Sequence, residues 1–202
     1  MVEIPFLTDD YICSISEKFL SDYWNSSLPV DIELIAEKNL DLILTPNEFL
    51  KQEFDMEALL LGDGTEIVYN RDTDSYRLRF SIAHEIGHLI LHSAFVDKLR
   101  PTSVEEWENT HVSLSDSLWG RLEYQANAFA GCVLVPRKQL IEEIVKLEPR
   151  IQAARKQASH LTQREVLPFI LPHLAKRFDV SHKVLEIEIE RRGIDVFDPI
   201  QN

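Results

Sequence analysis

The sequence predicts an α+β fold in which helices surround a small antiparallel or mixed sheet. Two observations support this prediction. Apolar residues recur three and four positions apart along most of the chain, which is the spacing of an amphipathic helix. Short β-prone runs bounded by turn residues lie between positions 40 and 70. A chain of 202 residues with 45% hydrophobic content can bury a full core, and it suits either one domain or one domain with a helical annex.

The first elements follow from apolar spacing and from proline. Apolar side chains on one face predict an amphipathic helix over residues 8–24. These side chains are Ile12, Ile15, Phe19 and Tyr23. Pro29 marks a break, after which we expect a short helix over residues 31–38 and a strand over residues 40–44.

A hairpin is expected over residues 57–70. The turn-forming segment Gly62-Asp-Gly-Thr65 separates a leucine run from an apolar strand that ends at Asn70. The strand Ile67–Asn70 is our candidate for a sheet edge that holds an extended peptide by backbone pairing. The same residues are equally compatible with an ordinary strand inside the sheet.

A helix follows the hairpin. Ser81 is suited to cap this helix, and the apolar residues from Ile82 to Leu91 recur at helical spacing. Gly87 lies inside the helix, where glycine costs roughly 1 kcal/mol relative to alanine. We therefore expect a strand or the wall of a site to approach the backbone closely at Gly87.

This helix carries the pentapeptide His-Glu-Ile-Gly-His at residues 84–88. Side chains four positions apart lie about 40° from each other around a helix, so His84 and His88 can converge on one ion. Glu85 is displaced by about 100° and can address a water molecule on the open side of that ion. The pattern indicates a zinc hydrolase, although it fixes only three residues and also occurs by chance on ordinary buried helices.

A catalytic zinc ion takes three protein ligands, so a third ligand is needed. The longer motif with a third histidine is excluded, because Leu91 and Ala94 occupy its glycine and histidine positions. The other common solution is a glutamate on a second helix, and residues 121–130 are suited to form one. Glu123 lies there on the same face as Asn127, which could hydrogen-bond a ligand's outer atom. By spacing alone, Glu123 competes with Asp97, Glu105, Glu106, Glu108, His111 and Asp116.

The two motif helices are separated by a polar segment over residues 93–117, whose length permits a lid, a substrate-selecting loop or a disordered stretch. Further amphipathic helices are expected beyond Pro136, namely over residues 137–146, 149–166, 167–178 and 181–192. We therefore predict a catalytic core over residues 1–136 and a helical subdomain over residues 137–202. The last two helices have the outline of a helix-turn-helix, but interspersed glutamates favour a packing pair.

The two motif segments together resemble the ImmA/IrrE family of zinc-dependent endopeptidases. Residues 77–92 read RLRFSIAHEIGHLILH and residues 123–130 read EYQANAFA, in the order and with the variable separation typical of that family. Residues 134–136 depart conservatively, with Leu-Val-Pro where Leu-Met-Pro is usual.

This resemblance implies a zincin-like metallopeptidase core in which His84, His88 and Glu123 bind zinc and Glu85 is the general base. It also implies limited cuts in a regulatory protein, commonly a DNA-binding transcriptional repressor encoded beside the peptidase. For the oxyanion donor, Tyr124, Tyr76 and His92 remain alternatives, and we also interpret His92 as a buried neighbour of the ligands. The competing function is a non-catalytic or toxin–antitoxin-like binding module that retains the zinc fold. A structural zinc site is the third interpretation, although no cysteine lies near the motif to close it.

The charge and the cysteines bear on partners and location. The net charge of -13 argues against direct binding to nucleic acid, and it suits a basic protein partner. We expect Cys13 and Cys132 to be free thiols in a reducing compartment. Neither a signal-like N-terminus nor an apolar run of membrane-spanning length is visible, so we predict a cytoplasmic protein without a membrane anchor.

Overall fold

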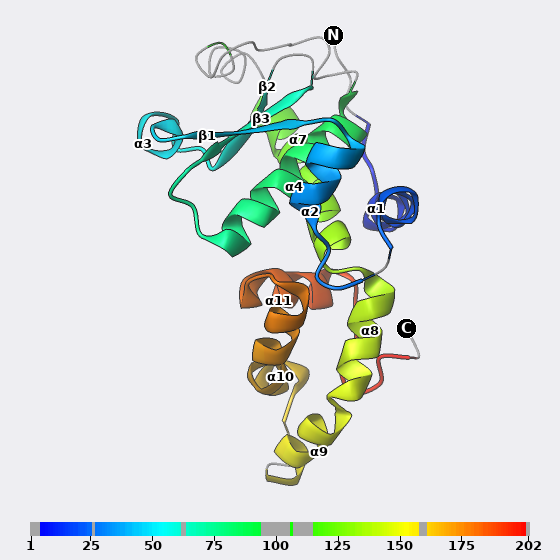
Figure 1. Ribbon diagram of the computed structural model, residues 1–202. Coiled ribbons are helices and arrows are strands. Elements are labelled where there is room, and N and C mark those ends of the chain that lie inside the picture. The colour runs from blue at the N-terminus through cyan, green and yellow to red at the C-terminus, as the bar shows by residue number, and fades with distance from the viewer. Residues whose placement is uncertain are drawn as a thin grey trace. The chain divides into compact units, whose positions relative to one another are not determined.

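The computed structural model describes residues 5–25, 27–61, 64–93, 106, 115–157 and 161–200. The chain forms two compact units, Met1–Val133 and Leu134–Asn202. The first unit combines the sheet with helices, and the second consists of helices in its described part (Figure 1). The α+β class predicted from the sequence is confirmed.

The sheet of the first unit has three strands, β1 (Ile43–Asn47), β2 (Ala58–Leu61) and β3 (Glu66–Asn70), in the order β1-β3-β2. Strand β1 pairs with β3 in parallel and β2 pairs with β3 antiparallel, so the sheet is mixed and the predicted hairpin is confirmed. Two residues of its turn, 62 and 63, lie outside the described residues.

Two strand predictions are wrong. Strand β1 starts three residues later than predicted, because the chain at Asp41 has a positive φ of 54° and turns there before it extends. The strand Ile67–Asn70 is also not a sheet edge, since β3 lies between β1 and β2 and pairs on both sides. The hairpin pattern did not indicate which of its two strands the parallel strand would join. The free edge beside the site belongs to β2.

Six helical segments of this unit are described. They are α1 (Asp9–Tyr23), α2 (Ile32–Leu34), the π-helical turn η1 (Ile35–Asn39), α3 (Leu50–Phe54), α4 (Ser75–Leu91) and α7 (Asp116–Leu134). The predicted helices over 8–24 and 31–38 are confirmed, whereas the short five-residue helix α3 was not predicted. Helix α1 packs against α7, where the rings of Phe19 and Phe129 meet edge to face at 5.4 Å between centroids.

Helix α4 begins seven residues earlier than the sequence prediction. Its N-cap is Asp74, whose carboxylate accepts a hydrogen bond from the Arg77 backbone N–H, so the prediction of Ser81 as N-cap is wrong. The extra turns are anchored by Arg79, a buried residue whose guanidinium donates to the Val30 carbonyl at 2.7 Å. The Asp74 carboxylate, which follows a polar turn, caps the helix in place of the Ser81 hydroxyl that lies closer to the histidines.

Gly87 marks the contact between α4 and α7. A Cβ atom at this position would lie 3.1 Å from both the Cα and the carbonyl oxygen of Ala126, and 3.3 Å from the ring of Phe129. The close approach predicted from the sequence therefore exists, but it is made by helix α7 and not by a strand. Because α7 also carries Glu123, this contact sets how near Glu123 comes to the histidines of α4.

We expect Gly87→Ala to lower the free energy of unfolding by about 1–2 kcal/mol. Overpacking against rigid backbone typically costs about 1–3 kcal/mol, which exceeds the gain in helix propensity of about 1 kcal/mol. Urea unfolding of the metal-free protein measures this change. Gly120→Ala is the matched control, since nothing lies within 4 Å of a Cβ atom there and its stability should rise. Stabilisation by both substitutions would contradict the close packing of α4 on α7.

The prediction of two free thiols is wrong. Cys13 of α1 and Cys132 of α7 form a disulfide, with their Cα atoms 5.5 Å apart. The two cysteines are 119 residues apart in the sequence, and only the packing of α1 on α7 brings them together. The cytoplasmic location stays a prediction, without the support of free thiols.

The second unit contains the described helices α8 (Arg137–Lys146), α9 (Glu148–Gln157), α10 (Gln163–Phe178) and α11 (His182–Arg191). The predicted boundary between helices at residues 166–167 is wrong. Thr162 and Glu165 form a capping box that starts α10 earlier, and the helix continues through Pro168 and Pro172. Among the described helices, none combines the length and apolar character that crossing a membrane requires.

Candidate metal centre

Helices α4 and α7 bring three potential ligands together in the first unit. The Nε2 atoms of His84 and His88 lie 3.0 Å apart. Each is 3.3 Å from a carboxylate oxygen of Glu123, namely Oε2 for His84 and Oε1 for His88. The three side chains form the one His, Cys, Asp and Glu cluster among the described residues whose donor atoms could hold a metal ion.

These separations suit a tetrahedral metal ion. Zinc binds imidazole nitrogen at about 2.0–2.1 Å and carboxylate oxygen at about 2.0–2.2 Å, so ligand atoms in a tetrahedral site lie roughly 3.3 Å apart. The donor set of two imidazoles and one carboxylate also matches that of catalytic zinc sites. The residues therefore fit a divalent metal ion of this kind.

The ionisable side chains of the cluster shift one another's pKa values. Burial raises the pKa of the Glu123 carboxyl, but its interactions with the imidazoles of His84 and His88 outweigh burial and place this pKa well below its ordinary value. Burial lowers the pKa of His84, but Glu123 and Glu85 together raise it above its ordinary value. Glu123 is consequently ionised, and its negative charge favours a cation beside it.

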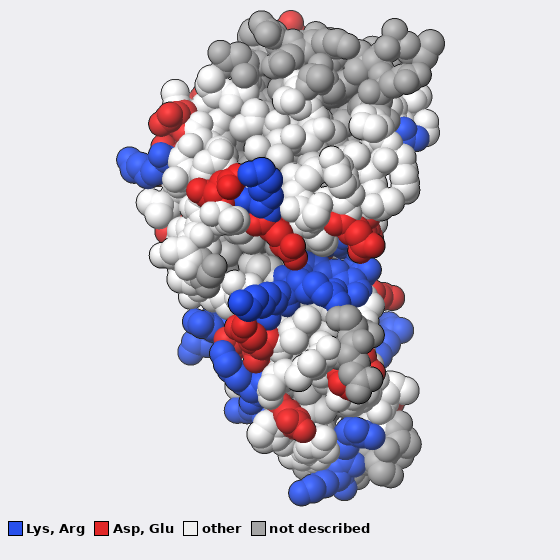
Figure 2. Space-filling model, turned by 90° about the vertical axis from the view of Figure 1, so that its right-hand side faces the viewer, with Lys and Arg blue, Asp and Glu red and all other residues white. Residues whose placement is uncertain are grey.

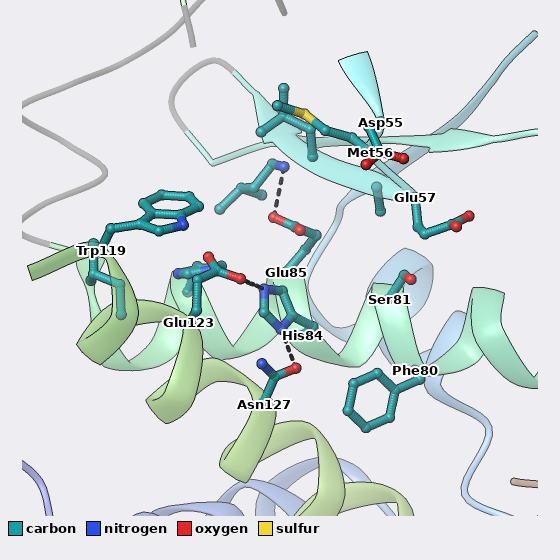
Figure 3. A pocket seen from close by; sticks show the side chains of 15 residues that line it. Asp55, Met56, Glu57, Phe80, Ser81, His84, Glu85, Trp119, Glu123 and Asn127 are labelled. Carbon is teal, nitrogen blue, oxygen red and sulfur yellow. Dashed lines mark hydrogen bonds and ion pairs between the residues drawn. The ribbon is translucent and has the colours of Figure 1, made fainter. Parts of the chain in front are cut away.

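Glu85 lies on the other side of the cluster, under strand β2. Its side chain is 7% exposed, and its Oε2 atom accepts a hydrogen bond from the Leu60 backbone N–H at 2.9 Å. Figure 3 shows this bond beside the contacts of His84 with Glu123 and Asn127. The helical spacing predicted that Glu85 would address the same site as the histidines, and the structure places it there.

A cavity of about 290 Å³ opens over the cluster. Its floor is formed by α4 and α7, its roof by β2, and Phe80 and Trp119 contribute aromatic walls (Figure 3). His84, Glu85, His88 and Glu123 all line this cavity. The arrangement can hold a metal ion, a water molecule activated by a carboxylate, and an extended chain along β2.

None of the three predicted oxyanion donors lines this cavity in the described structure. Tyr124 is 49% exposed, and its hydroxyl donates to Asp9 at 2.7 Å. Tyr76 lies on the first turn of α4, and His92 is buried behind His88. The polar side chains that do line the cavity close to the cluster are Ser81, Trp119 and Asn127.

The alternative third ligands are not part of the cluster. Glu106 and Asp116 are exposed and contribute no donor atom to it. The remaining alternatives lie outside the described residues, and they are Asp97, Glu105, Glu108 and His111. The segment predicted as a lid or selecting loop lies largely outside them as well.

Neighbouring residues contact the ring nitrogens of His84 and His88 that face away from the cluster. The Nδ1 atom of His84 lies 3.1 Å from Oδ1 of Asn127, which confirms the contact expected for Asn127. His88 contacts His92, and His92 contacts Gln125. The sequence pattern did not predict the role of Gln125, because Gln125 lies on a different face of α7 from Glu123. The i,i+4 spacing of His88 and His92 was the available signal for this contact.

Comparison with known families identifies one that covers most of the chain. Residues 49–190 match a peptidase family, M78, described as the IrrE N-terminal-like domain. The matched span contains α4 and α7 and therefore all four residues of the site. No curated protein matches the chain.

Proposed function

The chain belongs to the IrrE N-terminal-like peptidase family, and we propose that it is a zinc-dependent endopeptidase. His84, His88 and Glu123 bind the zinc ion, and Glu85 is the general base. The observation that carries this proposal is the convergence of the three ligand atoms next to a buried carboxylate, inside a cavity roofed by an edge strand.

The catalytic role of each group follows from its position in the site. A bound zinc ion lowers the pKa of a coordinated water and polarises a substrate carbonyl. Glu85 accepts the proton of the attacking water and returns it to the leaving amine. The Leu60 N–H fixes one oxygen of Glu85 at 2.9 Å and leaves the second oxygen for proton transfer.

Strand β2 supplies a docking edge for the peptide substrate. Glu57 pairs with Asn70, and alternate residues along β2 then face β3, so the backbone groups of Ala58 and Leu60 point to the free edge. The Leu60 N–H is used by Glu85. An extended peptide can pair with the remaining groups, chiefly the N–H and C=O of Ala58.

We expect Ala58→Pro to raise KM for peptide cleavage without loss of zinc. Proline removes the N–H that faces the free edge and leaves the β2–β3 hydrogen bonds intact, so roughly one hydrogen bond of about 0.5–1.5 kcal/mol is lost, or up to about tenfold in KM. Steady-state kinetics on a peptide substrate measures this change. Ala58→Val is the matched control, and an unchanged KM for Ala58→Pro would contradict docking along β2.

The substrate we propose is a basic regulatory protein, specifically a DNA-binding transcriptional repressor. The family resemblance indicates a repressor, and the charge of the cavity supports a basic chain. Its described lining contains the carboxylates Asp55, Glu57, Glu85 and Glu123 and no lysine or arginine. Asp55 and Glu57 are already paired with Lys51, at 2.8 and 3.1 Å. Glu57 also pairs with Arg77 at 2.9 Å, so a basic substrate would compete with these two residues for the carboxylates.

We also propose that the protein does not bind nucleic acid directly. The chain has a net charge of -13, which phosphates repel. Two arginines at the end of α11, Arg191 and Arg192, pair with the buried carboxylate of Glu188 and are not presented to a ligand. On the C-terminal helical part of the face in Figure 2, acidic and basic side chains lie next to each other.

Metal analysis followed by incubation with the purified product of the adjacent gene tests the proposed function. We expect about one zinc per chain and fragmentation of that protein that a chelator stops. Zinc binding without fragmentation would favour the alternative, a binding module that retains the metal site. A protein without zinc would overturn both.

A further inference from the structure

We propose that His92 and Gln125 are positioning residues that fix the tautomer of His88 and thereby present its Nε2 atom to the metal. This inference rests on the proposed function, because it takes His88 Nε2 as a zinc donor. It is carried by a chain of three hydrogen bonds that runs from the metal cluster to the N-terminal segment of the first unit.

The chain of contacts is continuous. His88 Nδ1 lies 3.1 Å from His92 Nδ1, His92 Nε2 lies 2.8 Å from Gln125 Oε1, and Gln125 Nε2 donates to the Pro5 carbonyl at 2.9 Å. The side chains are shielded from water, since His92 is 4% exposed and Gln125 is 1% exposed. Water therefore does not substitute readily for any missing partner.

The Pro5 carbonyl sets the direction of every bond in the chain. A carbonyl oxygen only accepts, so the Gln125 NH₂ group must point at Pro5 and its Oε1 atom at His92. That oxygen also only accepts, so His92 carries its proton on Nε2. Neutral His92 then has a lone pair on Nδ1, and His88 must donate from its own Nδ1.

The consequence for His88 is that its Nε2 lone pair faces the cluster. Without this chain, the Glu123 carboxylate, whose Oε1 atom lies 3.3 Å from His88 Nε2, would draw the proton to Nε2. A proton there would occupy the position of the metal. Asn127 fixes Nδ1 of His84 in an independent contact, so the two histidines have separate supports.

The test measures tautomers directly in the metal-free protein. Two-bond ¹⁵N–¹H NMR at about pH 8, where free imidazole is neutral, should show His88 protonated on Nδ1 in the unmodified chain. In Gln125→Leu we expect a population of His88 protonated on Nε2, while His84 keeps its Nδ1 proton. His88 protonated on Nε2 in the unmodified chain, or no change in Gln125→Leu, would overturn the proposal.

Zinc affinity provides the second measurement. Competition with a chromogenic chelator should show a loss of about 10–100-fold for His92→Phe, which is the usual effect of removing a ligand's outer partner. His92→Gln should restore part of this loss, because its amide oxygen can accept from His88. Equal affinities of His92→Phe and the unmodified chain, at matched unfolding temperatures, would contradict the assignment.

These two measurements separate the inference from the proposed function. The tautomer of His88 is a property of the metal-free chain and does not depend on peptidase activity. A chain with the predicted tautomers that cleaves no peptide would overturn the endopeptidase and retain the positioning roles. An active zinc peptidase in which His88 has the other tautomer would overturn the positioning roles and retain the endopeptidase.

Discussion

Glu85→Gln is expected to retain zinc and to lose nearly all peptide cleavage. The amide oxygen of glutamine can still accept the Leu60 N–H that holds Glu85 Oε2 at 2.9 Å, so the fold and the metal ligands should be unaffected. The amide cannot take a proton from the attacking water. General base catalysis typically contributes about 10²–10⁴-fold, and kcat should fall by at least this factor.

The measurement compares kcat and zinc content of Glu85→Gln with those of the unmodified chain. Glu17→Gln is the matched control, because Glu17 is an exposed residue of α1 and the same chemical change there should leave cleavage intact. Turnover by Glu85→Gln at the unmodified rate would refute the base assignment. Loss of zinc in this variant would contradict the claim that Glu85 is not a ligand.

Glu123→Gln should lose zinc. Glu123 is the one carboxylate in the cluster, and its ionised form lies 3.3 Å from both histidine Nε2 atoms. A neutral amide is a much weaker ligand, so the dissociation constant should rise by more than the about 10–100-fold that loss of an outer partner causes. Competition with a chelator measures this constant.

Asn127→Ala serves as the comparison for Glu123→Gln on the same helix. Asn127 contacts the outer nitrogen of His84 and does not bind the metal itself, so its removal should weaken zinc binding by about 10–100-fold. A smaller loss for Glu123→Gln than for Asn127→Ala would mean that Glu123 is not a metal ligand.

Local patterns predicted the parts of the fold that depend on near neighbours. Helical spacing identified α1, α4, α7 and α11, and the Gly-Asp-Gly turn identified the hairpin. Boundaries were less predictable, because a competing cap or turn a few residues away decides them. Asp74 in place of Ser81 at the start of α4 and the early start of α10 at Thr162 are both of this kind.

The site residues that could be predicted from helix geometry are those that lie within about one turn of a single helix. His84, His88 and Glu85 follow from helix geometry, while Glu123 needed the family resemblance to distinguish it from other acidic residues. Contacts between distant segments carried no local signal. The Leu60 N–H on Glu85, the Gln125 contact with His92 and the pairing of Cys13 with Cys132 all depend on tertiary packing.

A crystal structure of the zinc-loaded chain with anomalous scattering measured at the zinc absorption edge tests the central claim most directly. We predict a single strong anomalous peak within bonding distance of His84 Nε2, His88 Nε2 and a Glu123 carboxylate oxygen, with solvent as the fourth ligand. A peak elsewhere, or a Glu123 side chain turned away from the ion, would contradict the claim.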